Sequence, residues 1–482
     1  MKRIRRITSA RESGVALMTV LMVVAVTAAL GLTATAMTVS NTRNATFDRQ
    51  GGVAQNVSEA GVAQAVAWIR YYGVGTLSCS PSCNPANGQP DWGQGPNVNG
   101  AGPNTTIAAN ASYGHLVTLA GGQTFRVWIE KVAPFNPPTT KVGSYRVHSV
   151  GTFNGSGVAT GVRSVTSDIT VRPLMMPIGI FAHTVAAGGN GGIHYESLFS
   201  DSCIQGREKE SFQGMDAYLG VPAAAHSSNY IVNGQNTQCT AANSIHATSA
   251  CTLTTGSGSN TQDTSNDTDK AGGALTAGDG CYGHGQLNGQ TWLKTSQEPD
   301  FATMAQTYGF QTGGLSNSDL DALRTAAQQQ GFYFTNNNQI PAVLQATNAW
   351  QTYPHPVLFY DFKGTDVGDL VDLSDLKGYS RSFPLDSSQS GCLPMGAIVV
   401  VLRGNVRLNS NTVLAASVYA PGPSPNGQVT KANGTGQLIG TLYADSIDMT
   451  GTSDVFLDSC FLQNMSGGLF NVTATNYREV DR

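Results

Sequence analysis

An uncharged stretch near the start of the chain runs from Ser13 to Thr42 and sets a strict limit on how this region can fold. Within it, Val15 to Val39 is apolar apart from Thr, Ser and Gly. A helix rises about 1.5 Å per residue, so this segment is long enough to cross a bilayer core of roughly 30 Å. A cleaved secretory signal has a shorter apolar region, of about 7 to 15 residues. We therefore expect a membrane-spanning helix.

The distribution of charge predicts how this helix is oriented. Residues 1–13 hold five basic side chains against Glu12, while the rest of the chain holds 22 basic and 30 acidic residues. Because basic residues stay on the cytoplasmic side, residues 1–13 are expected inside and the chain beyond residue 40 outside. Only 12% of the chain is charged and the bulk is acidic, so the totals do not support a nucleic-acid-binding protein. The five basic residues are Lys2, Arg3, Arg5, Arg6 and Arg11.

The helix is expected to continue past the membrane as an amphipathic rod. Small and apolar residues recur at helical spacing, so they would lie on one face of a helix. This pattern predicts a helix over residues 15–72. The Gly51-Gly52 pair is expected to interrupt it as a flexible point. The residues of the common face are Phe47, Ala54, Val57, Gly61, Ala65 and Trp68.

Two runs within this region resemble the N-terminal segment of PilX-type minor pilins of type IV pilus systems: RESGVALMTVL at 11–21 and SEAGVAQA at 58–65. The resemblance implies that residues 1–14 are a basic prepilin leader and that prepilin peptidase cleaves between Gly14 and Val15. It also implies that the exposed helix packs with other pilins in the core of a filament.

Two residues depart from the common pilin pattern. The first mature residue would be Val15 instead of Phe, and the fifth is Thr19, where major pilins carry Glu. A buried carboxylate is costly unless it is paired, so a chain without it is poorly suited to repeated internal positions. The K-type pseudopilins of type II secretion also lack this Glu and lie at the filament tip. The resemblance thus implies a tip or initiating subunit; an ordinary single-pass anchor with a long stalk is the alternative.

Residues 73–175 are expected to form a pilin-type antiparallel β domain. A Gly-, Asn- and Pro-rich loop covers 73–113, and from His115 apolar and polar residues alternate in three runs that end near Pro173. Gly-rich turns separate the runs, which is typical of an antiparallel meander. A long helix followed by such a sheet agrees with the pilin resemblance.

Residues 176–482 contain a repeat. The segment from Phe181 aligns with that from Tyr443, and Val418-Tyr419-Ala420 matches Leu442-Tyr443-Ala444 at an offset of 24. Asp201-Ser202-Cys203-Ile204 also matches Asp458-Ser459-Cys460-Phe461. Short strands recurring in this way predict a β-solenoid-like domain with an insertion at about 205–350, which includes a helix from Ser318 to Gly331. The fold class is therefore α+β: an N-terminal transmembrane helix, a pilin-type antiparallel sheet and a large, mainly-β, right-handed solenoid-like domain.

The cysteines and acidic clusters suggest structural roles. Eight cysteines in an exported chain favour disulfides, although the spacing leaves their pairing open. We predict no cofactor and no metal site. Calcium binding at two acidic clusters is the alternative, although the order of ligands found in EF-hands is missing from both. The clusters are Asp263, Asn266, Asp267 and Asp269, and Asp366, Asp369, Asp372 and Asp375. The disulfide candidates are Cys79, Cys83, Cys203, Cys239, Cys251, Cys281, Cys392 and Cys460.

Taken together, the patterns favour a non-enzymatic minor pilin that contributes to pilus assembly and to surface binding or adhesion. Its partners would be other pilins, prepilin peptidase, the membrane and an unidentified surface ligand: a host, a surface, a polysaccharide or DNA. It would begin in the cytoplasmic membrane and end in the pilus at the cell surface. The alternatives are a passive surface protein and an anchored β-helix enzyme acting on polysaccharide, whose candidate residues are Asp445, Asp448, Asp458, Arg403 and Arg407.

Overall fold

The structure is a computed structural model. It describes residues 5–77, 115–153, 161–175, 177, 179–189, 192–206, 211–213, 216–220, 225–227, 230–233, 238–240, 281–285, 290–294, 314–362, 369–381, 392–393, 395–408, 413–422, 427–431, 437–451 and 454–480. The predictions for Cys79, Cys83, Cys251, the first acidic cluster and Asp366 lie outside these residues.

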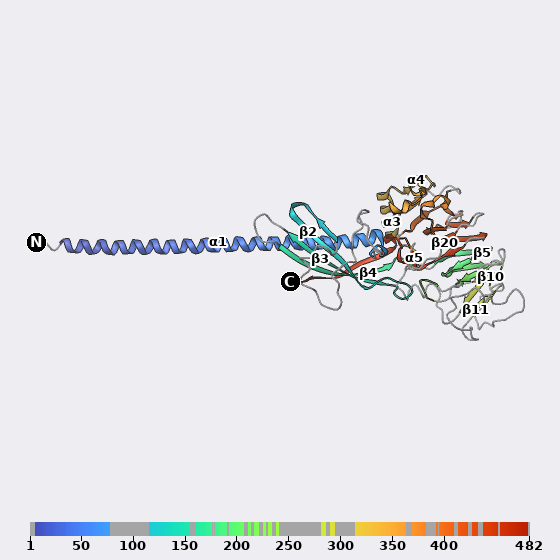
Figure 1. The fold of residues 1–482 in the computed structure, drawn as a ribbon, viewed down its shortest axis with the longest axis horizontal. Coiled ribbons are helices and arrows are strands. Elements are labelled where there is room, and N and C mark those ends of the chain that lie inside the picture. Colours follow the sequence, from blue (N-terminus) through green and yellow to red (C-terminus); the bar gives the residue numbers. More distant parts are fainter. Residues whose placement is uncertain are drawn as a thin grey trace.

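Helix α1 (Arg5–Tyr72) is the longest element and extends far beyond the rest of the molecule (Figure 1). The expected interruption at Gly51-Gly52 is wrong, because the helix is continuous through both residues. Here the helix begins to lie against a sheet, and a Cβ atom added at Gly51 would be 3.0 Å from the guanidinium of Arg163. Packing against the sheet thus supports helical backbone at a pair of residues that favours coil in isolation.

An antiparallel sheet covers the C-terminal half of α1. Its strand order is β1-β2-β3-β4-β22, so the three predicted runs lie side by side as β2, β3 and β4, and the last strand of the chain completes the sheet. The return of the C-terminal strand to this sheet was not anticipated. The strands are β1 (His115–Thr118), β2 (Gln123–Ala133), β3 (Gly143–Phe153), β4 (Gly161–Pro173) and β22 (Phe470–Val480).

Two glycines let the helix approach this sheet closely. A Cβ atom at Gly61 of α1 would lie 2.2 Å from the Ser149 hydroxyl, and one at Gly151 of β3 would lie 2.1 Å from the Ala54 carbonyl. Side chains on either side would clash, so glycine is required at both positions. Around them the predicted helix face is buried at Ala54, Val57 and Ala65, whereas Phe47 is half exposed. The core of this layer also includes Ile69, Phe125, Val127, Tyr145, Val147, Val165 and Ile169.

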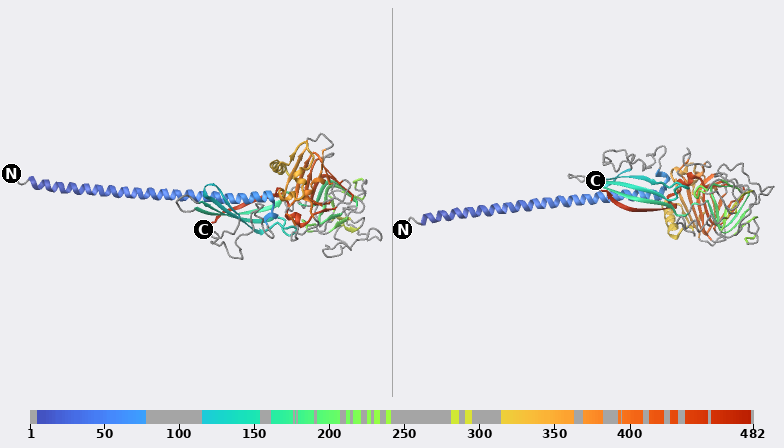
Figure 2. Two further views of the ribbon diagram at one scale, coloured as in Figure 1. Left: turned by 45° about the horizontal axis from the view of Figure 1, so that its top comes forward. Right: turned by 90° about the horizontal axis from the view of Figure 1, so that it is seen from below.

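The second sheet is almost entirely parallel and curls into a half-barrel (Figure 2). Among the described strands, β11 and β12 form its antiparallel pair. Most of the other strands pair with the strand that comes two later in the chain, as β14 does with β16, β16 with β18 and β18 with β20. The strands are β5 (Ile180–Gly189), β6 (Gly192–His194), β7 (Leu198–Gly206), β8 (Ser211–Gln213), β9 (Ala225–Ser227), β10 (Tyr230–Asn233), β11 (Cys281–Gly285), β12 (Gln290–Lys294), β13 (Tyr333–Phe334), β14 (Val357–Asp361), β15 (Leu370–Asp372), β16 (Ala397–Leu402), β17 (Asn405–Leu408), β18 (Val413–Ala420), β19 (Gln428–Lys431), β20 (Gln437–Gly451) and β21 (Val455–Phe456).

The repeat read from the sequence is confirmed as strand register. Tyr419 lies opposite Tyr443 in the β18–β20 pair, and Tyr443 lies opposite Phe181 in the β20–β5 pair. The four-residue match of Asp201 with Asp458 is wrong, because Asp201 lies in strand β7 whereas Asp458 caps a short helix. Four matching residues are too few to determine the backbone conformation that the segment adopts.

The order of strands in the half-barrel differs from their order in the chain. Spatially the strands run from β14 through β16, β18 and β20 to β5 and then β7, so the last long strand adjoins the first. The whole unit is inserted between β4 and β22 of the antiparallel sheet. Both connections therefore lie at the same end of that sheet, next to the C-terminal end of α1 (Figure 1).

Short helices pack against the half-barrel on its two faces. Helix α3 (Asn317–Gln330) ends at Gly331 as expected, but its N-cap is Ser316 and not Ser318, because the Ser316 hydroxyl accepts the Asp319 N–H. Helix α4 (Ala342–Gln345) packs over the interior, and α5 (Ser459–Gln463) leads into β22. The interior core of the half-barrel includes Ile180, Val185, Leu358, Tyr360, Val399, Val401, Val418 and Leu442.

Candidate functional site: the exposed helix and its junction with the half-barrel

The N-terminal half of α1 presents apolar side chains to its surroundings on every side. Leu21, Met22, Leu30, Leu32 and Met37 are each more than 60% exposed, whereas Ala54 and Ile69 farther along the same helix are fully buried. An exposed apolar surface of this extent marks a region that contacts a membrane or another protein.

From Thr27 onward, threonine hydroxyls of this half donate hydrogen bonds to the helix's own backbone. Thr27 donates to the Val23 carbonyl at 2.8 Å, Thr33 to that of Ala29 at 3.0 Å and Thr38 to that of Ala34 at 2.8 Å. In an apolar environment each polar group has to be satisfied within its own segment, and these bonds do so. By length and composition, the helix from Val20 onward is able to cross a membrane.

The predicted processing residues lie within α1. Gly14 and Val15 are helical and lie N-terminal to the exposed apolar side chains of α1. A helical backbone at these two residues does not test whether a peptidase cleaves between them, so cleavage stays a prediction.

The opposite end of α1 meets the half-barrel through close backbone contacts. A Cβ atom at Gly73 would lie 2.3 Å from the Met465 carbonyl, and one at Gly467 would lie 2.4 Å from that of Ile69. Arg70 donates to the Val472 carbonyl at 3.0 Å, which ties the helix to strand β22. The segment from α5 to β22 therefore forms the joint between the exposed helix and the half-barrel.

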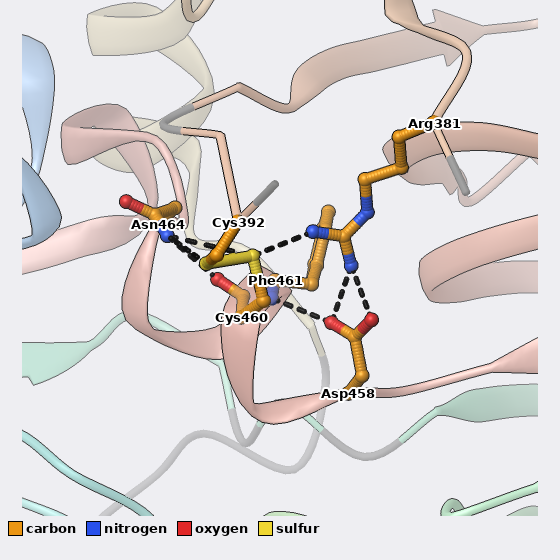
Figure 3. The surroundings of a disulfide bond; sticks show 6 residues. All are labelled: Arg381, Cys392, Asp458, Cys460, Phe461 and Asn464. Carbon is orange, nitrogen blue, oxygen red and sulfur yellow. Dashed lines mark hydrogen bonds and ion pairs between the residues drawn. A yellow bond between two sulfur atoms is a disulfide. The ribbon is translucent and has the colours of Figure 1, made fainter. Parts of the chain in front are cut away.

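A disulfide and a buried ion pair hold this segment in place (Figure 3). Cys392 bonds to Cys460 in α5, with a Cα–Cα distance of 5.6 Å. The guanidinium of Arg381 contacts both carboxylate oxygens of Asp458 and also donates to the Cys460 sulfur at 2.8 Å. Asp458 in turn accepts the Phe461 N–H at 2.7 Å and caps α5. Sequence reasoning missed Arg381, since nothing local marks it as the partner of a carboxylate far along the chain.

The other cysteine predictions have mixed outcomes. Cys203 and Cys239 form a second disulfide, with a Cα–Cα distance of 6.1 Å, and join β7 to the chain that follows β10. Cys281 lies in β11. The disulfide role of these four residues, Cys203, Cys239, Cys392 and Cys460, is thus confirmed.

Four of the residues considered for catalysis or calcium binding, Arg403, Arg407, Asp372 and Asp375, have partners of opposite charge close by. Arg403 pairs with Asp361, and Arg407 lies 3.5 Å from Asp372, whose carboxylate also accepts the Ser374 N–H. Asp375 lies 4.0 Å from Lys377. Within the described part of the chain, no group of three or more His, Cys, Asp or Glu is arranged to hold a metal.

A buried pair of acidic residues, Glu196 and Asp216, lies where the half-barrel approaches the antiparallel sheet. Asp216 accepts the N–H groups of Ser197, Tyr218 and Leu219. Glu196 is fully buried nearby, and neither of its carboxylate oxygens has a hydrogen-bond partner among the residues that the structure describes. Burial, followed by the charge of Asp216, raises the pKa of Glu196 well above its usual range. Burial also raises the pKa of Asp216, although these hydrogen bonds oppose it. Neither residue carried a signal in the sequence.

An open groove of about 760 Å³ runs between α1 and β22. Its walls are mostly apolar, and Glu59 at one end accepts a 2.9 Å hydrogen bond from the Tyr477 hydroxyl. Burial, followed by this hydrogen bond, raises the pKa of Tyr477. The groove is lined by Glu59, Val62, Ala63, Val66, Ala67, Arg70, Tyr71, Ala474 and Tyr477.

Comparisons with known proteins give little further guidance. No protein-family model matches the chain, and no curated protein matches it. A search of solved structures finds the competence-associated pilin ComZ from Thermus thermophilus at 12% identity, covering 89% of this chain and 97% of that one. The TM-score is 0.21, so the likeness carries no argument about fold or function.

Proposed function

We propose that this chain is a minor, tip-associated type IV pilin that assembles through α1 and binds surfaces through its half-barrel, which we interpret as a right-handed β-solenoid. The observation that carries the proposal is the division of α1 into two halves. One half is apolar and exposed all round, while the other is packed on an antiparallel sheet. This arrangement suits a subunit that first rests in a membrane and then packs its apolar helix against other helices.

The proposed topology follows from charge. Basic residues precede the apolar segment, so residues 1–14 would lie in the cytoplasm and the sheet and half-barrel outside. Prepilin peptidase would remove residues 1–14, and the chain would pass from the cytoplasmic membrane into the pilus. No catalytic activity and no cofactor are part of the proposal.

A position at the tip is supported by the size of the inserted unit. The half-barrel is attached at the end of the sheet remote from the membrane helix and extends the molecule along the direction of α1 (Figure 2). Stacked subunits would have to accommodate this unit at every position, whereas a terminal subunit leaves it unobstructed. Thr19 in place of the usual Glu agrees with a position outside the repeating filament.

The proposed partners divide between the two ends of the molecule. Other pilins would contact the apolar half of α1, and a surface ligand would contact the half-barrel, whose long parallel stack offers a broad face. A host, a surface, a polysaccharide and DNA remain the candidate ligand classes.

Mass spectrometry of the mature N-terminus in a sheared surface-filament fraction tests the proposal. We expect a chain that begins at Val15, and we expect the Gly14→Ala variant to keep residues 1–14 and to be lost from the filament fraction. Gly31→Ala, also in the apolar half of α1, is the matched control, because no heavy atom lies within 4 Å of the added Cβ position. An intact Met1 terminus confined to the membrane would contradict the proposal.

A further inference from the structure

The two sulfurs of the Cys392–Cys460 disulfide lie in different surroundings. Cys460 is fully buried in α5, whereas Cys392 is partly exposed. A thiolate arriving from solution therefore meets the Cys392 side of the bond first. Attack on one sulfur expels the other as a thiolate, so the surroundings of Cys460 determine how readily the bond breaks.

A positive charge lies next to the buried sulfur. The Arg381 guanidinium donates from Nη1 to Cys460 Sγ at 2.8 Å, and its side chain is only 2% exposed (Figure 3). A neighbouring guanidinium stabilises a thiolate relative to a thiol, and Arg stays charged even when buried. The other donor is neutral: the Asn464 amide lies 3.2 Å from Cys392 Sγ and 3.8 Å from Cys460 Sγ.

Asp458 moderates this effect. Its carboxylate binds the same guanidinium through both oxygens and draws part of the positive charge away from the sulfur. The ion pair and the disulfide are thus one connected group, and removing the carboxylate would leave the whole charge available to Cys460. The Cys203–Cys239 disulfide offers a comparison within the same molecule, where the neutral amide of Gln205 lies 3.8 Å from Cys239 Sγ.

We propose that Cys392–Cys460 is a directional thiol–disulfide exchange site, in which an external thiolate attacks Cys392 Sγ and Cys460 Sγ leaves as a thiolate held by Arg381. The reductant is a dithiol or two monothiols. The first thiolate sulfur of the reductant forms a mixed disulfide with Cys392 as the Cys392–Cys460 bond breaks. A second thiolate then attacks the sulfur of the reductant in that mixed disulfide, releases Cys392 as a thiolate and leaves the reductant oxidised. Two electrons pass to the protein, and the thiolates take up protons from solvent.

The site lies at the joint between the exposed helix and the half-barrel. Reduction would free the segment before β16 from α5, whose following residues contact Gly73 and Ile69 at the end of α1. In the reverse direction Cys460, whose thiolate Arg381 would stabilise, would be the nucleophile that closes the bond during oxidative folding. The redox state of this bond would thus govern how firmly the half-barrel is held on the helix, whatever the half-barrel binds.

Exchange with reduced glutathione tests the proposal on the full chain in detergent. Samples are quenched with acid and an alkylating reagent, and peptides are mapped by mass spectrometry. In the unchanged protein we expect glutathione on Cys392 and the alkyl group on Cys460; glutathione on Cys460 would overturn the proposal without any variant.

Two substitutions that break the same ion pair test the role of charge. We expect Arg381→Gln to slow exchange at Cys392–Cys460 on the order of tenfold, because the leaving thiolate loses its stabilising charge. We expect Asp458→Asn to accelerate it several-fold, and asparagine retains the helix cap. Simple loosening of the structure would accelerate exchange in both variants, so a change in the same direction, or no change in either, would overturn the proposal.

The control is the Cys203–Cys239 disulfide, whose exchange rate is read from the same digest. It should keep its rate in both variants. If its rate changes together with that of Cys392–Cys460, the substitutions have unfolded the chain, and the position of glutathione in the unchanged protein then decides the question alone.

Discussion

Phe181 stacks on Tyr443 with ring centroids 4.8 Å apart, although the two residues come from the first and last long strands of the half-barrel. Tyr419 stacks on the other side of Tyr443, also at 4.8 Å, and the three rings form a ladder across β18, β20 and β5. This ladder joins the two chain segments that build the half-barrel. It also belongs to the core shared with the antiparallel sheet, so it couples the two sheets.

Removing the end of this ladder should weaken the whole molecule. We expect Phe181→Ala to lower the free energy of unfolding by about 3 to 5 kcal/mol, since Phe181 is only 5% exposed and truncation leaves a cavity. Denaturant unfolding of the full chain in detergent measures this loss. Phe47→Ala removes the same ring at a position 49% exposed and should change stability by less than about 0.5 kcal/mol. Equal losses in the two variants would contradict the placement of the Phe181 ring in the buried core.

The close contact between α1 and β3 predicts opposite effects for two glycine substitutions in the same helix. Gly61→Ala should destabilise the protein by about 1 to 3 kcal/mol, because the new methyl group would lie 2.2 Å from the Ser149 hydroxyl. Gly52→Ala should stabilise it by up to about 1 kcal/mol, because no heavy atom lies within 4 Å of the added Cβ and alanine favours helix. Thermal unfolding of both variants measures the difference, and a stabilised Gly61→Ala would show that the helix does not approach the sheet this closely.

His355 should make the protein sensitive to mild acid. Burial lowers its pKa to about 4 from an ordinary value of 6.5, while the Gly396 carbonyl, 3.3 Å from Nδ1, acts in the opposite direction. The unfolded chain therefore binds a proton more readily than the folded chain. The stability contribution is complete above pH 6.5 and falls, by roughly 3 kcal/mol in total, as the pH is lowered toward 4.

Urea unfolding at several pH values between 4 and 7 measures this dependence. A His355→Gln variant should lose less stability than the unchanged protein over the same interval, because glutamine does not titrate. Since other ionisable groups are the same in both proteins, identical pH profiles would refute the assignment.

The exposed apolar half of α1 should determine membrane retention. We expect Leu30→Asp to release a measurable part of the protein from membranes during an alkaline wash, because an aspartate near the centre of a spanning helix costs about 3 kcal/mol. Val343→Asp in α4 replaces a side chain of comparable exposure on the half-barrel and should leave retention unchanged. If both variants are retained to the same extent, α1 is not the element that holds the protein in the membrane.

Local patterns in the sequence were sufficient for several elements. The uncharged run from Ser13 and the helical spacing up to Trp68 predicted one long helix, and the alternation around Val127 and Val147 predicted antiparallel strands. The offset of 24 between Tyr419 and Tyr443 predicted their pairing as well. These features could be read because each depends on residues that are close in the chain or that repeat at a constant interval.

Other features depend on contacts between residues that are far apart and follow no repeat. The pairing of Phe470 and Val472 with β4 was not predicted, because any edge strand offers the same hydrogen-bonding groups. The burial of Arg381 against Asp458 and the choice of Cys460 as the partner of Cys392 are of the same kind. At Gly51-Gly52 a prediction from local propensity failed. The two glycines predict a break, but the helix is continuous where Gly51 packs against Arg163.

Local sequence patterns were enough to define the elements: an apolar helix too long and too uncharged to remain in water unpartnered, alternating strands, and repeats whose constant spacing aligns them. How these elements close on one another followed only from their packing in three dimensions. This packing placed β20 beside β5, returned β22 to β4, and put Arg381 between a carboxylate and a sulfur. The physical reason is that local propensity and periodicity act over a few residues, whereas closure depends on which distant surfaces exclude water and satisfy buried charges together.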